Sequence, residues 1–186
     1  MLLDIRFLDD STRPIAPKLA GLTAAQKAPG RHLAAVHDHF RGEMATLRSL
    51  IERATAGEVS AAELQQRADA MPMVANYRRF GNLCGQHCQI INMHHSIEDQ
   101  SIFPALREQG DAFRRVADRL EEEHGIVHEL LVRLVAAINE LIGTPSPENF
   151  AACQQLYDAL ERVLLSHFGY EEDSIGDALG YYAIGA

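Results

Sequence analysis

Residues 94–106, HHSIEDQSIFPAL, and residues 167–179, HFGYEEDSIGDAL, are two copies of one pattern. They align without gaps at an offset of 73, and six of the thirteen positions are identical. Each copy carries a histidine followed four residues later by a glutamate, which gives the pairs His94/Glu98 and His167/Glu171. Because residues i and i+4 share one face of an α-helix, each pair predicts two metal-ligating side chains on the same side of a helix.

Both copies lie within longer stretches whose apolar residues recur every three or four positions, as in amphipathic helices. Prolines and glycines separate these stretches. The expected helices cover about residues 31–55, 72–108, 111–142 and 147–179, with a shorter helix after Ser60. No segment alternates apolar and polar residues, so we predict no sheet. Four long amphipathic helices with short connections predict an all-α fold, an up-down-up-down four-helix bundle.

The length of the chain and the positions of its prolines and glycines predict one domain with extensions. Residues 1–30, rich in proline and glycine, form an irregular N-terminal arm, residues 31–180 form the bundle, and residues 181–186 form a short tail. In the helix over 72–108 the spacing places Ile102 on the inner face, and Pro104 predicts a kink. The second copy of the pattern has Gly176-Asp177 in place of Phe103-Pro104, which predicts a looser helix end.

Composition excludes several classes of function. The chain has 26 acidic and 17 basic side chains, a net charge of −9 and no basic run, which argues against binding to nucleic acid or to anionic membranes. It contains no apolar run long enough to span a membrane. Three cysteines cannot form a disulfide framework, and the first residues, MLLDIRFLDD, lack the pattern of a secretory signal. These features predict a cytoplasmic protein.

Five histidines and two glutamates fall on the predicted inner faces of the helices. They are His37, His94, Glu98, His124, His128, His167 and Glu171. Each buried polar group without a partner costs about 1–3 kcal/mol, against a net stability of only about 5–15 kcal/mol. Bound metal would satisfy all seven groups, and imidazoles with carboxylates suit iron or another transition metal. Seven ligands are too many for one ion and predict two six-coordinate ions, with the carboxylates as bridges.

Neighbouring residues offer alternatives for two of these ligands. His94 ranks above His95 because the repeat aligns it with His167, and His37 ranks above His39 because His39 lies off the apolar face. His95 and Asp99 could instead orient a ligand from outside the metal's coordination shell. Both choices stay open at this point.

The sequence assigns no ligand role to His32 or Cys153 and leaves alternatives open for Cys84, His87 and Cys88. His32 is expected at the surface, and Cys153 in the core. Cys84 and Cys88 lie on one helix face beside His87, where they would be buried apolar residues, a redox-sensitive thiol pair or ligands of a second metal.

The motifs as a set resemble one protein family. HHSIEDQSIFPAL, EEEHGIVHEL (121–130) and HFGYEEDSI are similar to signatures of the hemerythrin family of HHE cation-binding domains, and VHDHFRGEM (36–44) resembles a bacterial subgroup. The resemblance covers residues 31–180. It implies two non-haem iron ions with an oxo or hydroxo bridge, five histidine and two carboxylate ligands, and dioxygen at an open iron position. By motif, the ligands are the same seven residues.

Three classes of function follow from the resemblance and stay open. The first is binding of dioxygen for transport, storage or sensing, and the second is an enzyme that reduces peroxide, O2 or NO. The third is storage or donation of iron. Since protonated imidazole cannot bind metal, we expect iron to be released below about pH 6. The sequence specifies no oligomeric state.

Overall fold

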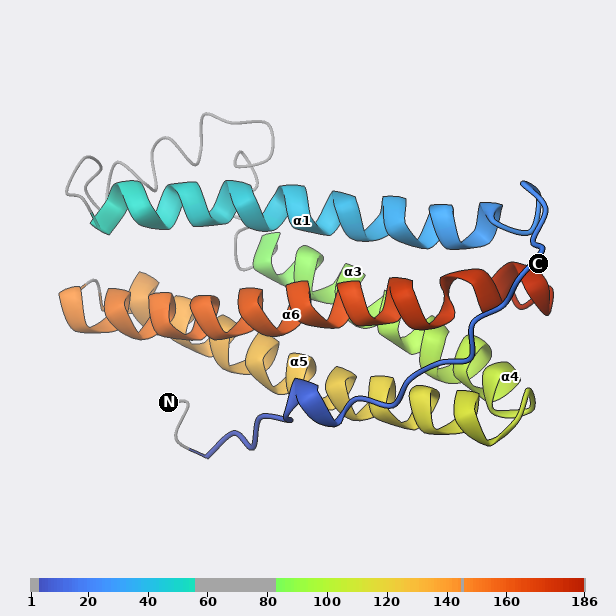
Figure 1. Cartoon of the computed structure of the whole chain (residues 1–186). Coiled ribbons are helices and arrows are strands. Elements are labelled where there is room, and N and C mark those ends of the chain that lie inside the picture. Colours follow the sequence, from blue (N-terminus) through green and yellow to red (C-terminus); the bar gives the residue numbers. More distant parts are fainter. Residues whose placement is uncertain (1–3, 56–82, 145, 186) are drawn as a thin grey trace. The chain divides into compact units, whose positions relative to one another are not determined.

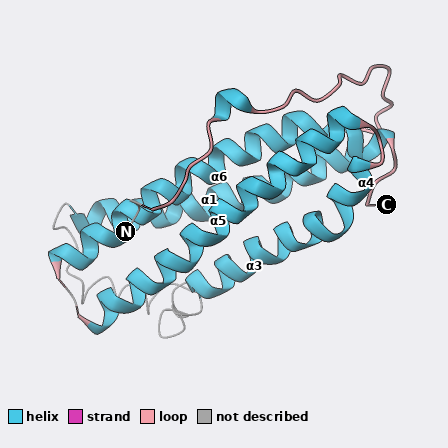
Figure 2. Ribbon diagram, turned by 90° about the horizontal axis from the view of Figure 1, so that it is seen from below, coloured by secondary structure: helices cyan, strands magenta, loops and turns pink. Residues whose placement is uncertain are grey.

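The computed structural model describes residues 4–55, 83–144 and 146–185 (Figure 1). The long helices are α1 (Ala28–Thr55), α3 (Leu83–Ile97), α5 (Asp111–Gly143) and α6 (Pro147–Tyr181); the short ones are η1 (Asp10–Thr12), the π-helical turn η2 (Glu98–Ile102) and α4 (Phe103–Arg107). The described ranges contain no strand (Figure 2), and the prediction of an all-α helix bundle is confirmed. The helix expected after Ser60 and the beginning of the one expected over 72–108 lie outside the described residues.

The described residues form two compact units. Residues 5–41, 94–127 and 162–185 make the first, here called the site unit, and residues 4, 42–55, 83–93, 128–144 and 146–161 make the second. In the second unit, Arg48 forms an ion pair with Asp158 at 2.8 Å, and the hydroxyl of Tyr157 donates a hydrogen bond to the backbone oxygen of Met44. None of the helices in the described ranges has the length and apolar character needed to cross a bilayer.

In the site unit, α1 and α6 run antiparallel and pack very closely. Gly180 lies against the backbone of Gln26, and a Cβ at Gly30 would lie 2.5 Å from the backbone oxygen of Gly176. Further along, His37 of α1 lies beside the C-terminal half of α6. The expected loosening near Gly176 is therefore not seen, since glycine there permits a tight helix crossing and α6 continues to Tyr181.

The α3–η2–α4 segment runs antiparallel to α5, with Asp99 paired with His124 and Arg107 paired with Asp118. The apolar core beneath these helices is one cluster of buried residues: Leu33, Phe103, Leu106, Phe113, Val116, Ala117, Leu120, Ile175, Ala178, Leu179 and Ile184. Figure 1 shows that the four helical segments of the site unit alternate in direction around this core, as the up-down-up-down prediction requires.

The π-helical turn η2 changes which residues face this core. The backbone N–H of Phe103 donates to the backbone oxygen of Glu98, five residues earlier, instead of four. Pro104 has no N–H and its ring crowds the preceding turn, which favours the wider spacing. As a result Phe103 is fully buried, whereas Ile102, which the sequence placed on the inner face, is only partly buried.

The N-terminal arm is an extended segment of the site unit that includes η1 and packs on the unit's helices. Ala16 and Leu19 lie against the apolar core, and the hydroxyl of Tyr170 donates to the backbone oxygen of Pro14 at 2.9 Å. The arm leads directly into α1, which begins at Ala28, three residues earlier than expected. It is therefore in contact with the helices that carry the histidines.

Candidate metal centre

Seven buried or largely buried side chains of the site unit form two groups that could each hold a metal ion. The first group is His95, His124 and His167, and the second is His37, His94, Glu98 and Glu171. Within each group the potential ligand atoms all lie within 4.8 Å of one another. The ligands come from α1, from the α3–η2 segment, from α5 and from α6. The packing of these helices in the site unit therefore brings the two groups together.

The first group consists of imidazoles alone. The Nε2 atoms of His124 and His167 are 3.2 Å apart. The ring of His95 stacks on that of His124, with 3.7 Å between ring centroids, and its buried Nε2 has no hydrogen-bond partner in the described part of the chain. Neutral imidazole nitrogens that converge in this way are typical ligands of a transition metal.

The second group mixes imidazoles with carboxylates. The Nε2 atoms of His37 and His94 are 3.1 Å apart. An oxygen of Glu98 lies 3.1 Å from Nε2 of His94, and an oxygen of Glu171 lies 3.4 Å from Nε2 of His37. The two carboxylates therefore approach the same pair of nitrogens.

Both carboxylates also reach the first group. An oxygen of Glu98 lies 3.7 Å from Nε2 of His124, and an oxygen of Glu171 lies 3.6 Å from Nε2 of His167. Each glutamate is thus close to a histidine of either group. Carboxylates in this position could bridge two metal ions held side by side.

The oxygens of Glu98 and Glu171 are buried and accept no hydrogen bond from the described residues. Burial, together with the neighbouring Glu171 carboxylate, raises the pKa of Glu98 far above its usual range. Burial alone would raise the pKa of Glu171 as well, but the nearby rings of His37 and His167 bring it below its usual value. Two buried carboxylates this close together are unfavourable without a cation. The residues present therefore fit bound metal cations.

Three of the histidines are held from behind by a carboxylate. The Nδ1–H groups donate to Glu172 from His37 at 2.8 Å, to Asp99 from His124 at 2.8 Å, and to Glu123 from His167 at 3.0 Å. A carboxylate in this position fixes the tautomer and the orientation of a metal-binding imidazole. In each case Nε2 is left facing the other ligands. The expected role of Asp99 beside a ligand matches this contact.

Burial keeps three of the histidines, His94, His95 and His124, neutral and ready to bind metal. It lowers the pKa of His94 to about 4, although the Glu171 carboxylate opposes the shift. It also lowers the pKa of His95 and of His124, the latter against the opposing effect of Asp99. Metal binding at neutral pH therefore requires no proton to leave these three rings.

The structure brings together six of the seven ligands that the sequence predicts. His128 is the exception: it is exposed and belongs to neither group. The buried face of α5 passes through His124, Val127 and Leu131, and His128 lies one residue off that face. His128 as a ligand therefore stays a prediction that these contacts do not support.

His95 takes a place in the centre that the sequence reasoning gave to His94 alone. The repeat aligned one histidine per copy, so the second histidine of the HH pair was ranked below the first. The signal that could have identified His95 was the consecutive pair His94-His95, since two neighbouring residues at the border of a helix's buried face can both reach the core. Of the other candidates, His32 and His39 are exposed and Cys153 is buried, whereas the side chains of Cys84, His87 and Cys88 lie outside the described residues.

Comparison with known proteins agrees with this geometry. Residues 28–179 match the sequence model of the Hemerythrin HHE cation binding domain. No curated protein and no solved structure gave a significant match. The match covers most of the chain, including all seven residues of the two ligand groups. The chain belongs to the hemerythrin family, and its core is an HHE cation-binding domain.

Proposed function

We propose that the protein holds two non-haem iron ions in this centre and binds dioxygen there. The observation that carries the proposal is the pair of buried ligand groups, with Glu98 and Glu171 each close to a histidine of both. Five imidazoles and two carboxylates suit iron in two adjacent sites better than a single ion. We place this function in the cytoplasm because three cysteines are too few for a disulfide framework.

The chain's own residues would hold the ions, orient the imidazoles and exclude water. Aromatic rings pack directly against the ligands: Phe168 stacks on His37 with 4.2 Å between centroids, and Phe103 lies 5.3 Å from His124. Such walls lower the local dielectric and limit access of solvent to the metal. A ferrous pair would supply the electrons that reversible binding of dioxygen requires. A dry, rigid pocket favours binding and release of the gas over its further reduction.

The test is iron content and optical spectra of protein produced with ample iron. We expect about two iron ions per chain and, after anaerobic reduction, a stable oxygenated band on exposure to air. Fewer than one ion per chain would rule out the di-iron proposal. Rapid decay of the band with consumption of peroxide would favour the enzymatic alternative, and rapid loss of iron to a weak chelator would favour storage or donation.

Helix α1 offers a matched pair of variants for this test. His37 is fully buried in the second ligand group, whereas His39, two residues later, is exposed. We expect His37→Ala to lose most of the bound iron and His39→Ala to retain it. Equal losses would overturn the assignment of the ligand on α1.

A further inference from the structure

We propose that Arg13, in the N-terminal arm, is a positioning residue of the metal centre, because it fixes the Glu123 carboxylate that holds His167. The inference deepens the function proposed above and rests on the metal site. It also assigns a role to the N-terminal arm, which contributes no ligand to the metal centre. Two consecutive contacts lead from Arg13 in the arm to His167, and a third set of contacts holds Arg13 in place.

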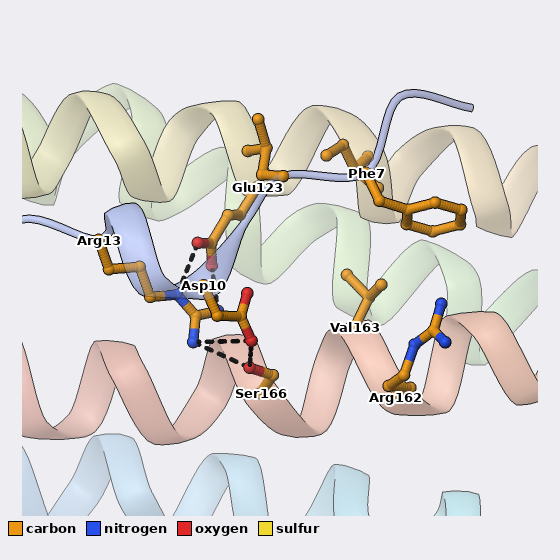
Figure 3. Close-up of a pocket in the computed structure, with 9 residues that line it drawn as sticks. Phe7, Asp10, Arg13, Glu123, Arg162, Val163 and Ser166 are labelled. Atoms are coloured by element: carbon orange, nitrogen blue, oxygen red, sulfur yellow. Dashed lines mark hydrogen bonds and ion pairs between the residues drawn. The ribbon is translucent and has the colours of Figure 1, made fainter. Parts of the chain in front are cut away.

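The first contact is a two-point ion pair between Arg13 and Glu123 (Figure 3). Arg13 Nε lies 2.9 Å from Glu123 Oε1, and Arg13 Nη2 lies 2.9 Å from Glu123 Oε2. The planar guanidinium holds both carboxylate oxygens at once, which fixes the plane of the carboxylate. The Glu123 side chain is only 4% exposed, so water competes little for this pair.

The second contact joins Glu123 to the metal centre. Glu123 Oε2 accepts a hydrogen bond of 3.0 Å from Nδ1 of the fully buried His167. With the proton on Nδ1, the lone pair of Nε2 points towards Nε2 of His124, 3.2 Å away. The oxygen that orients His167 is therefore the same oxygen that Arg13 Nη2 holds.

The third set of contacts holds Arg13 itself in place. Its Nη1 donates to Ser166 Oγ at 2.8 Å and lies 3.4 Å from Asp10 Oδ2, and its guanidinium lies over the Tyr170 ring at 4.7 Å. Ser166 and Tyr170 directly precede the ligands His167 and Glu171 on α6. The arm is thus anchored on the same stretch of helix that carries two of the ligands.

A second arginine does not duplicate this role. Arg119 Nε contacts Glu123 Oε1 at 2.7 Å, while its Nη1 and Nη2 bind Thr12 Oγ1 and the backbone oxygen of Asp9. Without Arg13, Glu123 keeps a partner at Oε1, but Oε2 loses the group that fixes it towards His167. Arg119 instead ties η1 to α5 and supports the arm.

The test compares Arg13→Ala and Arg13→Lys with Arg162→Ala as a matched control. Arg162 also contacts the arm, with its guanidinium 5.4 Å from the centre of the Phe7 ring, but Figure 3 shows it away from the ion-paired Arg13 and Glu123. Loss of a group that supports a metal ligand weakens metal binding about 10–100-fold. We expect both Arg13 variants to release ferrous iron to a chelator, under anaerobic conditions, about tenfold faster than the wild type. Arg162→Ala should stay within about twofold.

A second readout needs no metal. In the metal-free protein, long-range ¹H–¹⁵N correlation spectra should show His167 protonated on Nδ1, and both Arg13 variants should show a mixture of tautomers. Unchanged tautomer and release rate in the Arg13 variants would overturn the proposal. Full rescue by Arg13→Lys would also overturn it, because a single ammonium supplies the charge without the two-point contact. If the wild type bound no iron, the function proposed above would fail, while the tautomer would still test the link from Arg13 to His167.

Discussion

Burial lowers the pKa of the His94 imidazole to about 4, so this ring stays neutral at pH values where an exposed histidine is already protonated. Protons and metal compete for the same lone pair. The sequence alone predicted release of iron below about pH 6, the range of an unperturbed histidine. With the pKa lowered, we expect the protein to retain its iron at pH 5 and to lose it as the pH approaches 4. Iron content after anaerobic dialysis between pH 7 and pH 3.5 measures this, and half-loss near pH 6 would contradict it.

The same shift makes the stability of the metal-free protein depend on pH. The folded pKa of His94, about 4, lies below the unfolded value of 6.5, so the unfolded chain binds more protons between these limits. The stability contribution is therefore fully present above pH 6.5 and is lost as the pH falls towards 4, by up to about 3 kcal/mol from this one ring. His95 acts in the same direction. Urea unfolding of the metal-free protein at pH 7, 5.5 and 4.5 measures the slope, which His94→Asn should reduce. The same slope in the wild type and in His94→Asn would refute the expectation.

Two single substitutions distinguish the ligands seen in the structure, which include His95, from the ligands predicted from the sequence, which include His128. His95 lies in the core against His124 and is only 5% exposed, whereas His128 is exposed on α5. We expect His95→Ala to reduce bound iron by about one ion per chain and His128→Ala to leave the iron content unchanged, as elemental analysis would show. The reverse outcome would restore His128 to the centre in place of His95.

At the scale of helices, the close approach of α6 to the arm and to α1 depends on glycine. A Cβ at Gly180 would collide with the backbone of Gln26, whereas nothing lies within 4 Å of a Cβ at Gly169 on the same helix. Gly180→Ala must therefore push the segments apart, and such overpacking costs about 1–3 kcal/mol. Gly169→Ala should instead stabilise the helix by about 0.5–1 kcal/mol. Thermal unfolding of the two variants should shift in opposite directions, and a stabilised Gly180→Ala variant would refute the close contact.

The helices themselves could be predicted from the sequence because their signals are local. The ends of α5 and α6 fall within two residues of the expected ones, and the apolar residues that recur every three or four positions along α5, from Phe113 to Ile138, are buried. The π-helical turn η2 could not be predicted in this way. It inserts one residue into the inner face, so the regular spacing that correctly placed Glu98 failed at Ile102 and missed Phe103.

In the candidate site, too, the residues related by local spacing could be predicted and the others could not. Ligands that repeat at a spacing of four, such as His167 and Glu171, follow from helix geometry. The partners behind them come from other elements: Glu123 reaches His167 from α5, and Arg13 reaches Glu123 from the arm, 110 residues away in sequence. No periodicity in the chain relates these residues. Only packing brings them together.

For the molecule as a whole, the metal centre opposes folding until it is filled. Glu98 and Glu171 are buried beside each other without hydrogen-bond partners in the described residues, and burial raises the pKa of Glu98 far above its usual range. Because the folded pKa of Glu98 exceeds the unfolded value of 4.5, the contribution of this carboxyl to the stability of the metal-free protein falls as the pH rises above about 4.5, opposite in sign to the contribution of His94. A bound cation removes this penalty. Metal binding and overall stability are therefore coupled through the two carboxylates.

Glu98→Gln tests this coupling, because the amide has nearly the same shape without the charge. An unsatisfied buried polar group costs about 1–3 kcal/mol and a buried carboxylate more, so the metal-free variant should unfold at a temperature equal to or above that of the metal-free wild type. Ferrous iron at about one hundred times its dissociation constant should raise the wild-type Tm by roughly 5–10 °C. The variant, which lacks a shared ligand, should show little of this rise.

Glu140→Gln removes an exposed charge from α5 and should respond to iron as the wild type does. A Glu98→Gln protein that is less stable without metal would show that Glu98 does not oppose folding. One that gains the full stabilisation with iron would show that Glu98 does not bind the metal.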